Sequence, residues 1–234
     1  MDISAGGRHS FFLTEDQTLF CCGDANHGQL GLDLKALKNF DRVCTPTELT
    51  VFKGKNIMAV ACGKYHTLFL VDGIVYACGH NREGQIGNGN TENAYKPVKL
   101  GLNNCISVSA WHSSAALTES GEVFIWGVPN FKKPHKISTQ QFNEVKVGGN
   151  FTLFTDAEGR IMTSTNGSQP HYVSGLEENF ASELCVGGNF AFVIGKTTIG
   201  TEEESPAKEY EAVDSGRSQE AYEEADHQQE AEEE

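Results

Sequence analysis

A short motif returns along the chain and constrains its fold more than any other feature. At 3–13 and 60–70 it reads apolar residue, two small residues, glycine, two variable residues, histidine, a small residue and an apolar run. A third copy lies at 107–117, and two weaker copies follow with phenylalanine near the histidine position. In chain order, that position holds His9, His66, His112, Phe151 and Phe190. Because these histidines lie 57 and then 46 residues apart, the pattern predicts an array of supersecondary repeats.

Each copy is followed by signals for further short strands. An apolar strand ending near glycine occurs at 19–23, 75–79 and 123–127, and turn residues such as Asp72-Gly73 precede it. A short strand with a proline closes each unit, and proline suits an edge strand because it lacks a donor N–H. These prolines are Pro46, Pro97, Pro134 and Pro170. The sequence therefore predicts an all-β fold, an incomplete β-propeller of four-stranded blades with four repeats plus part of a fifth.

The predicted domain organisation is an array of repeats followed by an acidic tail. We expect the repeats to span 1–200, and their units are placed at 1–55, 56–104, 105–143, 144–180 and, in part, 181–200. Residues 201–234 contain 14 acidic and two basic residues, so they carry −12 of the net charge of −14 and leave −2 for the rest. This tail has no Leu, Ile, Phe or Trp. We expect it to be disordered, because it cannot bury enough apolar surface to offset its ordering entropy.

Charge and hydropathy exclude several functional classes. No Lys/Arg stripe that would bind phosphates is visible, which makes nucleic acid an improbable partner. No signal peptide opens the chain, and no apolar run approaches the roughly 18 residues of a membrane span. The seven cysteines form no CxxC pair. We therefore expect no membrane insertion and a reducing, intracellular and cytoplasmic setting, with a nuclear or ciliary location left open.

The repeated histidines and the cysteines do not predict a metal or catalytic site. His9, His66 and His112 occur one per unit, whereas structural zinc ligands usually lie a few residues apart. A buried histidine that satisfies backbone groups between strands is the favoured interpretation. No nucleophile and base depart from the repeat pattern. We expect neither a cofactor nor a metal, and a protein that is not an enzyme in the metabolic sense.

Two glycine-rich turns add a more specific signal. Gly-Gln-Leu-Gly at 28–31 and Gly-Gln-Ile-Gly at 84–87 each follow their repeat histidine by 18 or 19 residues. With the histidine motif, they resemble the regulator-of-chromosome-condensation repeat family over residues 1 to about 200. The positions that carry the repeat signature are Gly6, His9, Gly28, Gln29, Gly31, Gly63, His66, Gly84, Gln85, Gly87, His112, Trp126 and Gly127.

The resemblance implies a propeller that binds other proteins, since the family holds small GTPases or associated factors. It also implies guanine-nucleotide exchange on a Ran- or Rab-like GTPase as an alternative function. A second alternative is a binder of histones or other basic proteins through the acidic tail. The family normally has seven units. The chain is therefore a fragment, a tighter ring of fewer blades, or one part of a self-associated ring.

One loop is the main candidate for partner contact. The insertion 32–45 places apolar residues three apart among basic ones, as a short helical turn with an apolar stripe would. The alternative is that this stripe packs on the propeller rim. Its candidate contacts are Leu34, Lys35, Leu37, Lys38, Phe40 and Arg42. Arg82 and Glu83, together with the loop Asn88–Tyr95, are further candidates.

Overall fold

The computed structural model describes residues 2–32, 42–176 and 179–197, and within these ranges nearly all of the regular secondary structure is β-strand. The first sheet contains β1 (Asp2–Ala5), β2 (His9–Leu13), β3 (Leu19–Asp24) and β4 (Arg42–Glu48). The second contains β5 (Ile57–Cys62), β6 (His66–Val71), β7 (Ile74–Gly79) and β8 (Ala94–Lys99), after a single 3-10 turn, η2 (Thr50–Phe52). The third contains β9 (Cys105–Ala110), β10 (Ser114–Thr118), β11 (Val123–Trp126) and β12 (His135–Lys136). The fourth contains β13 (Phe142–Val147), β14 (Phe151–Asp156), β15 (Ile161–Thr165) and β16 (His171–Tyr172). The hairpin β17 (Asn179–Val186) and β18 (Ala191–Thr197) follows.

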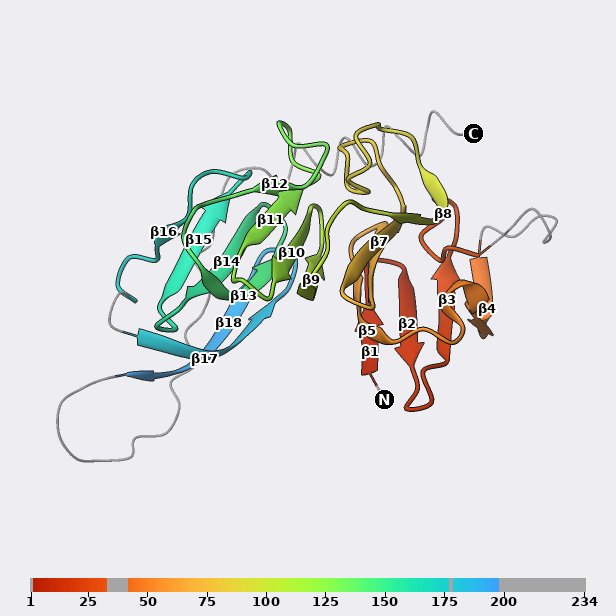
Figure 1. Cartoon of the computed structure of the whole chain (residues 1–234), viewed down its shortest axis with the longest axis horizontal. Coiled ribbons are helices and arrows are strands. Elements are labelled where there is room, and N and C mark those ends of the chain that lie inside the picture. The colour runs from red at the N-terminus through yellow and green to blue at the C-terminus, as the bar shows by residue number, and fades with distance from the viewer. Residues whose placement is uncertain (1, 33–41, 177–178, 198–234) are drawn as a thin grey trace.

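The strands of each four-stranded sheet pair with their sequence neighbours, all antiparallel, so each sheet is one consecutive meander. The sheets follow one another as blades of an arc (Figure 1), and their first strands pack in succession, β1 on β5, β5 on β9, β9 on β13 and β13 on β17. This arrangement confirms an incomplete propeller of four repeats plus part of a fifth.

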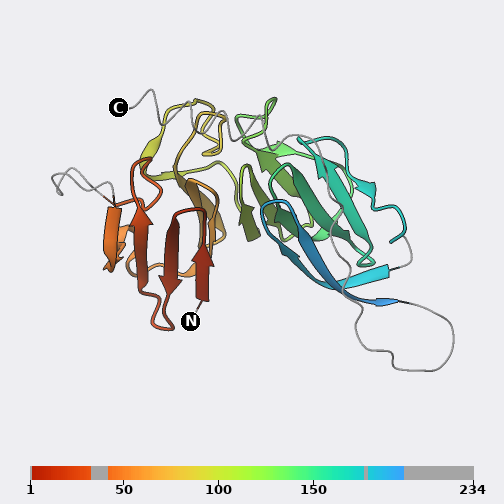
Figure 2. The ribbon, with the colours of Figure 1, turned by 180° about the vertical axis from the view of Figure 1, so that it is seen from behind.

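The array does not close on itself. The first sheet and the β17–β18 hairpin are separated in the front and back views (Figures 1 and 2), and within the described residues no packing like that of β1 on β5 joins them. A tighter closed ring is therefore not what these repeats form. β2 has only its alternate residues fully buried, as expected for a sheet that is covered on one face.

Alternation along the middle strands explains why the core lies between sheets. In β6, Phe69 and Val71 pack toward the first sheet, whereas Leu68 and Leu70 pack toward the third. All six residues of this strand are buried. Side chains alternate between the two faces of a strand, so a continuous apolar run suits a sheet that is covered on both faces. The arc is therefore stabilised mainly by contacts between neighbouring blades.

The predicted prolines lie in the outermost strand of their sheets or directly before it. Pro46 and Pro97 belong to β4 and β8, and Pro134 and Pro170 immediately precede β12 and β16. Each of these strands is the last in its sheet. Their free edges tolerate the missing N–H donor.

The array has two ends that differ in their connections. We call one end of the array the loop face. It carries the first turn of each unit, β1–β2, β5–β6, β9–β10, β13–β14 and β17–β18, and the long connections β3–β4, β7–β8 and β11–β12. It is uppermost in Figure 1. The opposite end is the hairpin face, which carries the short β2–β3, β6–β7, β10–β11 and β14–β15 turns.

The strand bounds revise the predicted insertion and refine the approximate unit boundaries. Residues 42–45 belong to β4, so the insertion is shorter than 32–45. Strands β13 and β17 begin at Phe142 and Asn179, before the unit boundaries expected at 144 and 181. The predicted contacts between Leu34 and Phe40, and the acidic tail, lie outside the described residues.

A further correction concerns His112. Ser113, not His112, is the equivalent of His9 and His66, because Ser114 pairs with Trp126 as Thr67 pairs with Cys78. The first turn of the third unit is one residue shorter than that of the second, and Trp111 N–H donates to Ser113 O as Gly63 N–H does to His66 O. Because this turn is shorter, His112 lies one residue before the position that His9 and His66 occupy. Residue spacing along the sequence does not reveal this shift.

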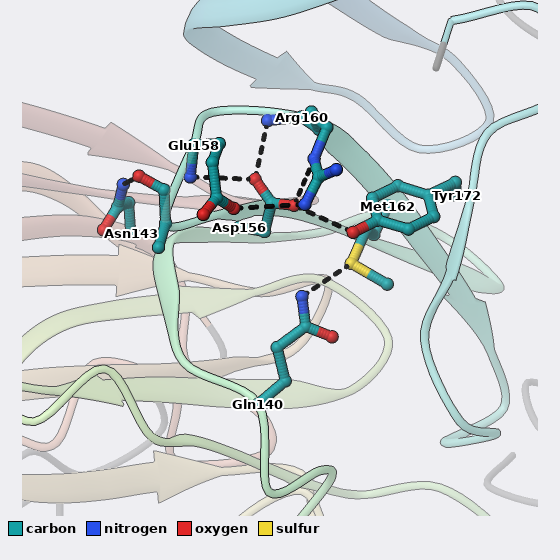
Figure 3. Close-up of polar contacts among 8 residues, drawn as sticks. Gln140, Asn143, Asp156, Glu158, Arg160, Met162 and Tyr172 are labelled. Carbon is teal, nitrogen blue, oxygen red and sulfur yellow. Dashed lines mark hydrogen bonds and ion pairs between the residues drawn. The ribbon is translucent and has the colours of Figure 1, made fainter. Parts of the chain in front are cut away.

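Asp156 secures the fourth sheet on the hairpin face (Figure 3). Its carboxylate, 1% exposed, accepts hydrogen bonds from Arg160 Nε at 2.8 Å and Tyr172 Oη at 3.0 Å, so it joins the β14–β15 turn to β16. It also accepts from the backbone N–H groups of Glu158 and Arg160. Burial alone would raise the pKa of Asp156, but these donors together hold it below its usual value.

We expect Asp156→Ala to lower the free energy of unfolding by about 2–4 kcal/mol, because it leaves several donors without their acceptor. Urea unfolding followed by circular dichroism measures this loss. Glu158→Gln is the matched control, since Glu158 contacts the same Arg160 but its side chain is 62% exposed. The control should cost less than about 0.5 kcal/mol. Equal losses in both variants would contradict the role assigned to Asp156.

Candidate protein-interaction face

The signature glutamines form the joints between blades. Gln85 Oε1 accepts a hydrogen bond from Glu83 N–H at 3.0 Å, which holds its own turn closed. Its backbone carbonyl accepts from Ser114 Oγ at 2.8 Å and Trp126 Nε1 at 2.7 Å, both on the next sheet. Gln29 repeats the arrangement with His27 N–H, Thr67 Oγ1 and Cys78 Sγ. The residues next to the glutamines, Leu30 and Ile86, are fully buried.

The signature histidines complete the same joints. His9 Nε2 lies 2.8 Å from Thr67 Oγ1, and His66 Nε2 lies 2.8 Å from Ser114 Oγ. The Thr67 and Ser114 hydroxyls donate their protons to the backbone carbonyls of the two signature glutamines. Each hydroxyl therefore accepts a hydrogen bond from its histidine, which fixes the Nε2–H tautomer of the imidazole. The histidines therefore bind side-chain hydroxyls of the next blade, and His9 also interacts with the backbone of His66.

Burial keeps these two imidazoles neutral. It lowers the pKa of His9 to about 4, against an opposing effect of Asp24, and it lowers the pKa of His66 to about 3. His9 Nδ1 has no hydrogen-bond partner among the described residues, as the unprotonated nitrogen of this tautomer can tolerate. In this neutral form, both residues serve the joints between blades.

Close backbone approach explains the signature glycines. Gly28 has φ +85°, and a Cβ there would lie 2.5 Å from Tyr95 Cα. Gly84 also has φ +85°, and its Cβ would lie 2.7 Å from Lys132 Cα. Side chains at these positions would be strained in the backbone and would collide with the next blade. These glycines let the blades pack closely and serve the scaffold.

The buried thiols of Cys21, Cys62 and Cys78 are poorly suited to nucleophilic chemistry. Burial raises the pKa of Cys21 and of Cys62 to about 12, and it also raises that of Cys78. A thiol with such a pKa holds almost no thiolate at neutral pH. Among the described residues, no group of three or more His, Cys, Asp or Glu side chains could hold a metal ion.

A cluster of rings on the loop face joins the first two blades. His27 lies edge-on to Tyr65 and to His80, with ring centroids 5.5 and 5.1 Å apart. The Lys64 ammonium lies 5.2 Å from the centroid of the Tyr65 ring. Asn93 Nδ2 approaches His27 Nδ1 at 3.5 Å. These side chains are all half-buried, so each retains surface for a partner.

A second group of side chains lies on the loop face between the second and third blades. Gly89 N–H donates to Lys132 O at 3.1 Å, so the β7–β8 and β11–β12 connections are hydrogen-bonded. Lys132 and Lys133 line a shallow hollow of about 420 Å³, next to the stacked rings of Phe131 and His135, whose centroids are 3.9 Å apart. The hollow is open to solvent, and no Asp or Glu is among the residues that line it.

The predicted contact residues are partly placed by the structure. Arg42, Arg82 and Glu83 are exposed on the loop face. Leu34, Lys35, Leu37, Lys38 and Phe40 lie outside the described residues. Sequence reasoning missed His27, Tyr65, His80, Lys132 and Lys133 as neighbours. A sequence signal existed for His27, Tyr65 and His80, which lie next to the motif residues Gly28, His66 and Gly79, but Lys132 and Lys133 adjoin no repeat motif. Over its described ranges, the chain contains no helix with the length and hydropathy of a membrane span.

Comparison with known proteins agrees with this architecture. The profile of the regulator of chromosome condensation (RCC1) repeat matches residues 16–70 and 72–116, and a second profile of the same description matches 2–29 and 58–85. The X-linked retinitis pigmentosa GTPase regulator of Mus musculus is 35% identical over 140 residues, which cover 53% of this chain and 13% of that protein. The order of the units and the stretch 115–127 indicate the same relative. The human RCC1-like G exchanging factor-like protein is 32% identical over 133 residues, covering 54% of this chain and 28% of that protein.

Solved structures show the same fold. Human WBSCR16 superposes with a TM-score of 0.72 at 22% identity, over 83% of this chain and 59% of that one. Prp20p of Saccharomyces cerevisiae gives a TM-score of 0.70 at 19% identity, over 85% and 56%. The chain thus spans little more than half of these propellers, and far less of the retinitis pigmentosa relatives. The matched profiles show that residues 16–70 and 72–116 are repeats of the RCC1 family, and the solved structures show that the fold of these repeats continues through the described part of the chain.

Proposed function

We propose that the chain is a protein-binding platform that holds a small GTPase, or a factor associated with one, on its loop face. The observation that carries this proposal is the cluster of His27, Tyr65 and His80, which presents rings from two blades beside the Lys64 cation. Rigid aromatic side chains with a nearby cation are typical of the residues that dominate binding at protein interfaces. The names of the relatives, a GTPase regulator and a G exchanging factor-like protein, suggest the kind of partner.

The burial of the repeat-signature residues supports this assignment. His9, His66, Gln29 and Gln85 are buried in the joints between blades. The exposed surface that varies between units is the loop face, where a rigid scaffold displays its connections. The insertion 33–41 leaves from this same face, between β3 and β4, and stays a predicted contact.

Binding to a panel of Ran- and Rab-like GTPases, each loaded with GDP, with a GTP analogue or with no nucleotide, tests the proposal. With the full chain immobilised, we expect Tyr65→Ala combined with Arg82→Ala to weaken binding at least about tenfold, as loss of an interface anchor does. Lys53→Ala with Lys55→Ala is the control, because it removes two cations from the hairpin face. Circular dichroism verifies that both variants fold. Absence of binding by any GTPase, or equal weakening by both variants, would overturn the proposal.

Guanine-nucleotide exchange is a second candidate, favoured by the likeness to the human RCC1-like G exchanging factor-like protein. Exchange needs no covalent chemistry, only stronger binding to the nucleotide-free GTPase than to the loaded one. Release of labelled GDP from the same panel measures it. We expect release to be faster than the intrinsic rate and slowed by Tyr65→Ala with Arg82→Ala. Release at the intrinsic rate would remove this function while leaving the platform intact.

A further inference from the structure

The two faces of the arc differ in whether their cations form ion pairs. On the hairpin face, Lys53 pairs with Glu48 at 3.7 Å and Lys55 with Asp72 at 3.9 Å. Lys136 likewise pairs with Glu122, and Arg160 pairs with Asp156 and Glu158. These four cations lie beside carboxylates, whereas Lys99, at the hairpin end of β8, forms no ion pair with another described residue.

The loop face carries cations without such partners. Arg82, Lys132 and Lys133 are exposed, and none of them forms an ion pair with another residue in the part of the chain that the structure describes. Glu83 and Glu92 are the described exposed carboxylates on the same connections. Because Gly89 N–H binds Lys132 O, the three cations belong to neighbouring loops of two blades. Their fields add over the hollow beside Lys132 and Lys133, which makes this part of the surface attractive to an anionic peptide.

The chain itself supplies an anionic peptide of matching character. Residues 201–234 carry 14 acidic and two basic residues, with runs such as 202–204 and 232–234. This segment follows β18, which runs away from the loop face and ends at Thr197 on the hairpin side. A segment as long as 198–234 has a root-mean-square span of roughly 30 Å and a much greater contour length, while crossing the height of β18 takes only about 25 Å. The tail is therefore long enough to return to the loop face.

We propose that the acidic tail 201–234 binds the cations Arg82, Lys132 and Lys133 on the loop face and so occupies the hollow beside them. The hairpin face is the poorer partner, because its own carboxylates lie beside four of its cations and repel the tail. The contact is intramolecular and needs no GTPase, so it can be tested independently of the proposed function. Where a protein partner uses the loop face, the tail competes with it and raises the concentration of partner that binding requires.

Hydrogen exchange of the full chain tests the contact without a partner. At low salt, backbone amides of the 80–93 and 129–135 connections should exchange about threefold or more slowly than in a variant whose tail glutamates are replaced by glutamine. Raising the salt to about 0.5 M should abolish the difference, because screening shortens the reach of exposed charges. Equal exchange in the two proteins at low salt would overturn the proposal.

A matched pair of charge reversals locates the surface. Lys132→Glu with Lys133→Glu should remove the protection, whereas Lys53→Glu with Lys55→Glu alters the charge equally on the hairpin face and should leave it in place. A synthetic peptide of residues 201–234 provides a second measurement. It should bind the tail-neutralised chain at least about tenfold more tightly than the natural chain, whose own tail competes. Equal affinity for both chains, or equal effects of the two reversals, would contradict the assignment.

Discussion

Replacement of Trp126 by alanine is expected to lower the free energy of unfolding by about 3–5 kcal/mol. Trp126 is completely buried in the core between the second and third sheets. It also donates to Gln85 O at 2.7 Å across the blade joint. The variant therefore creates a large cavity and weakens the joint at once. Urea unfolding measures the loss, and Trp111 remains as the fluorescent probe.

Two further variants separate the cavity from the hydrogen bond. Trp126→Phe keeps much of the ring volume and removes the N–H donor, so it should cost about 1–2 kcal/mol. Trp111→Phe is the control, because Trp111 is only half-buried on the loop face, and it should cost less than about 1 kcal/mol. If Trp126→Ala cost no more than this control, the joint would not stabilise the array.

Acidification is expected to destabilise the fold through His9 and His66. Their folded pKa values, about 4 and about 3, lie below the value of 6.5 that an unfolded histidine has. As the pH falls through 6.5, the unfolded chain takes up protons that the folded chain does not, so stability declines. The decline continues until the folded pKa is reached. At about pH 5 each histidine should contribute roughly 2 kcal/mol to this loss.

His66→Gln isolates one of the two contributions. Glutamine can still donate to Ser114 Oγ but does not titrate, so the variant should be less stable at about pH 7.5 by roughly 1 kcal/mol. Between about pH 7.5 and 5 it should lose roughly 2 kcal/mol less than the natural chain. Urea unfolding at both pH values gives the difference, from which other titrating groups cancel. An unchanged pH dependence would show that His66 is not buried in its neutral form.

Much of the fold was predictable because its strands and turns follow from local sequence signals that repeat along the chain. Apolar runs, turn residues and the closing prolines each depend on neighbours in sequence, and the strands lie where those signals predict them. The turns around Gln29 and Gln85 were recognised for the same reason. The physical role of the two glutamines was not predictable. The hydroxyls that donate to their backbone carbonyls belong to Thr67 and Ser114, which lie 38 and 29 residues further along the chain.

The candidate site was much less predictable. His27, Tyr65 and His80 come from three separate connections. The pairing of β6 with β7 and the packing of the first blade on the second bring their rings within contact distance. Lys132 belongs to a loop that sequence reasoning left unremarked, yet its backbone binds Gly89 of the preceding blade. His112 was placed one residue out of register because a shortened turn preserves the residue types while it shifts the pairing.

The sequence by itself determined that this chain forms repeated four-stranded units and that its charge is concentrated in the last residues, because strand periodicity, turn chemistry and composition are properties of short segments. Only the tertiary structure decided that the signature histidines join one blade to the next and that the array stays open. It also decided that Arg82, Lys132 and Lys133, which form no ion pair with other described residues, lie on one face. Those outcomes depend on which residues meet across blades, and that is set by packing between sheets rather than by spacing along the chain.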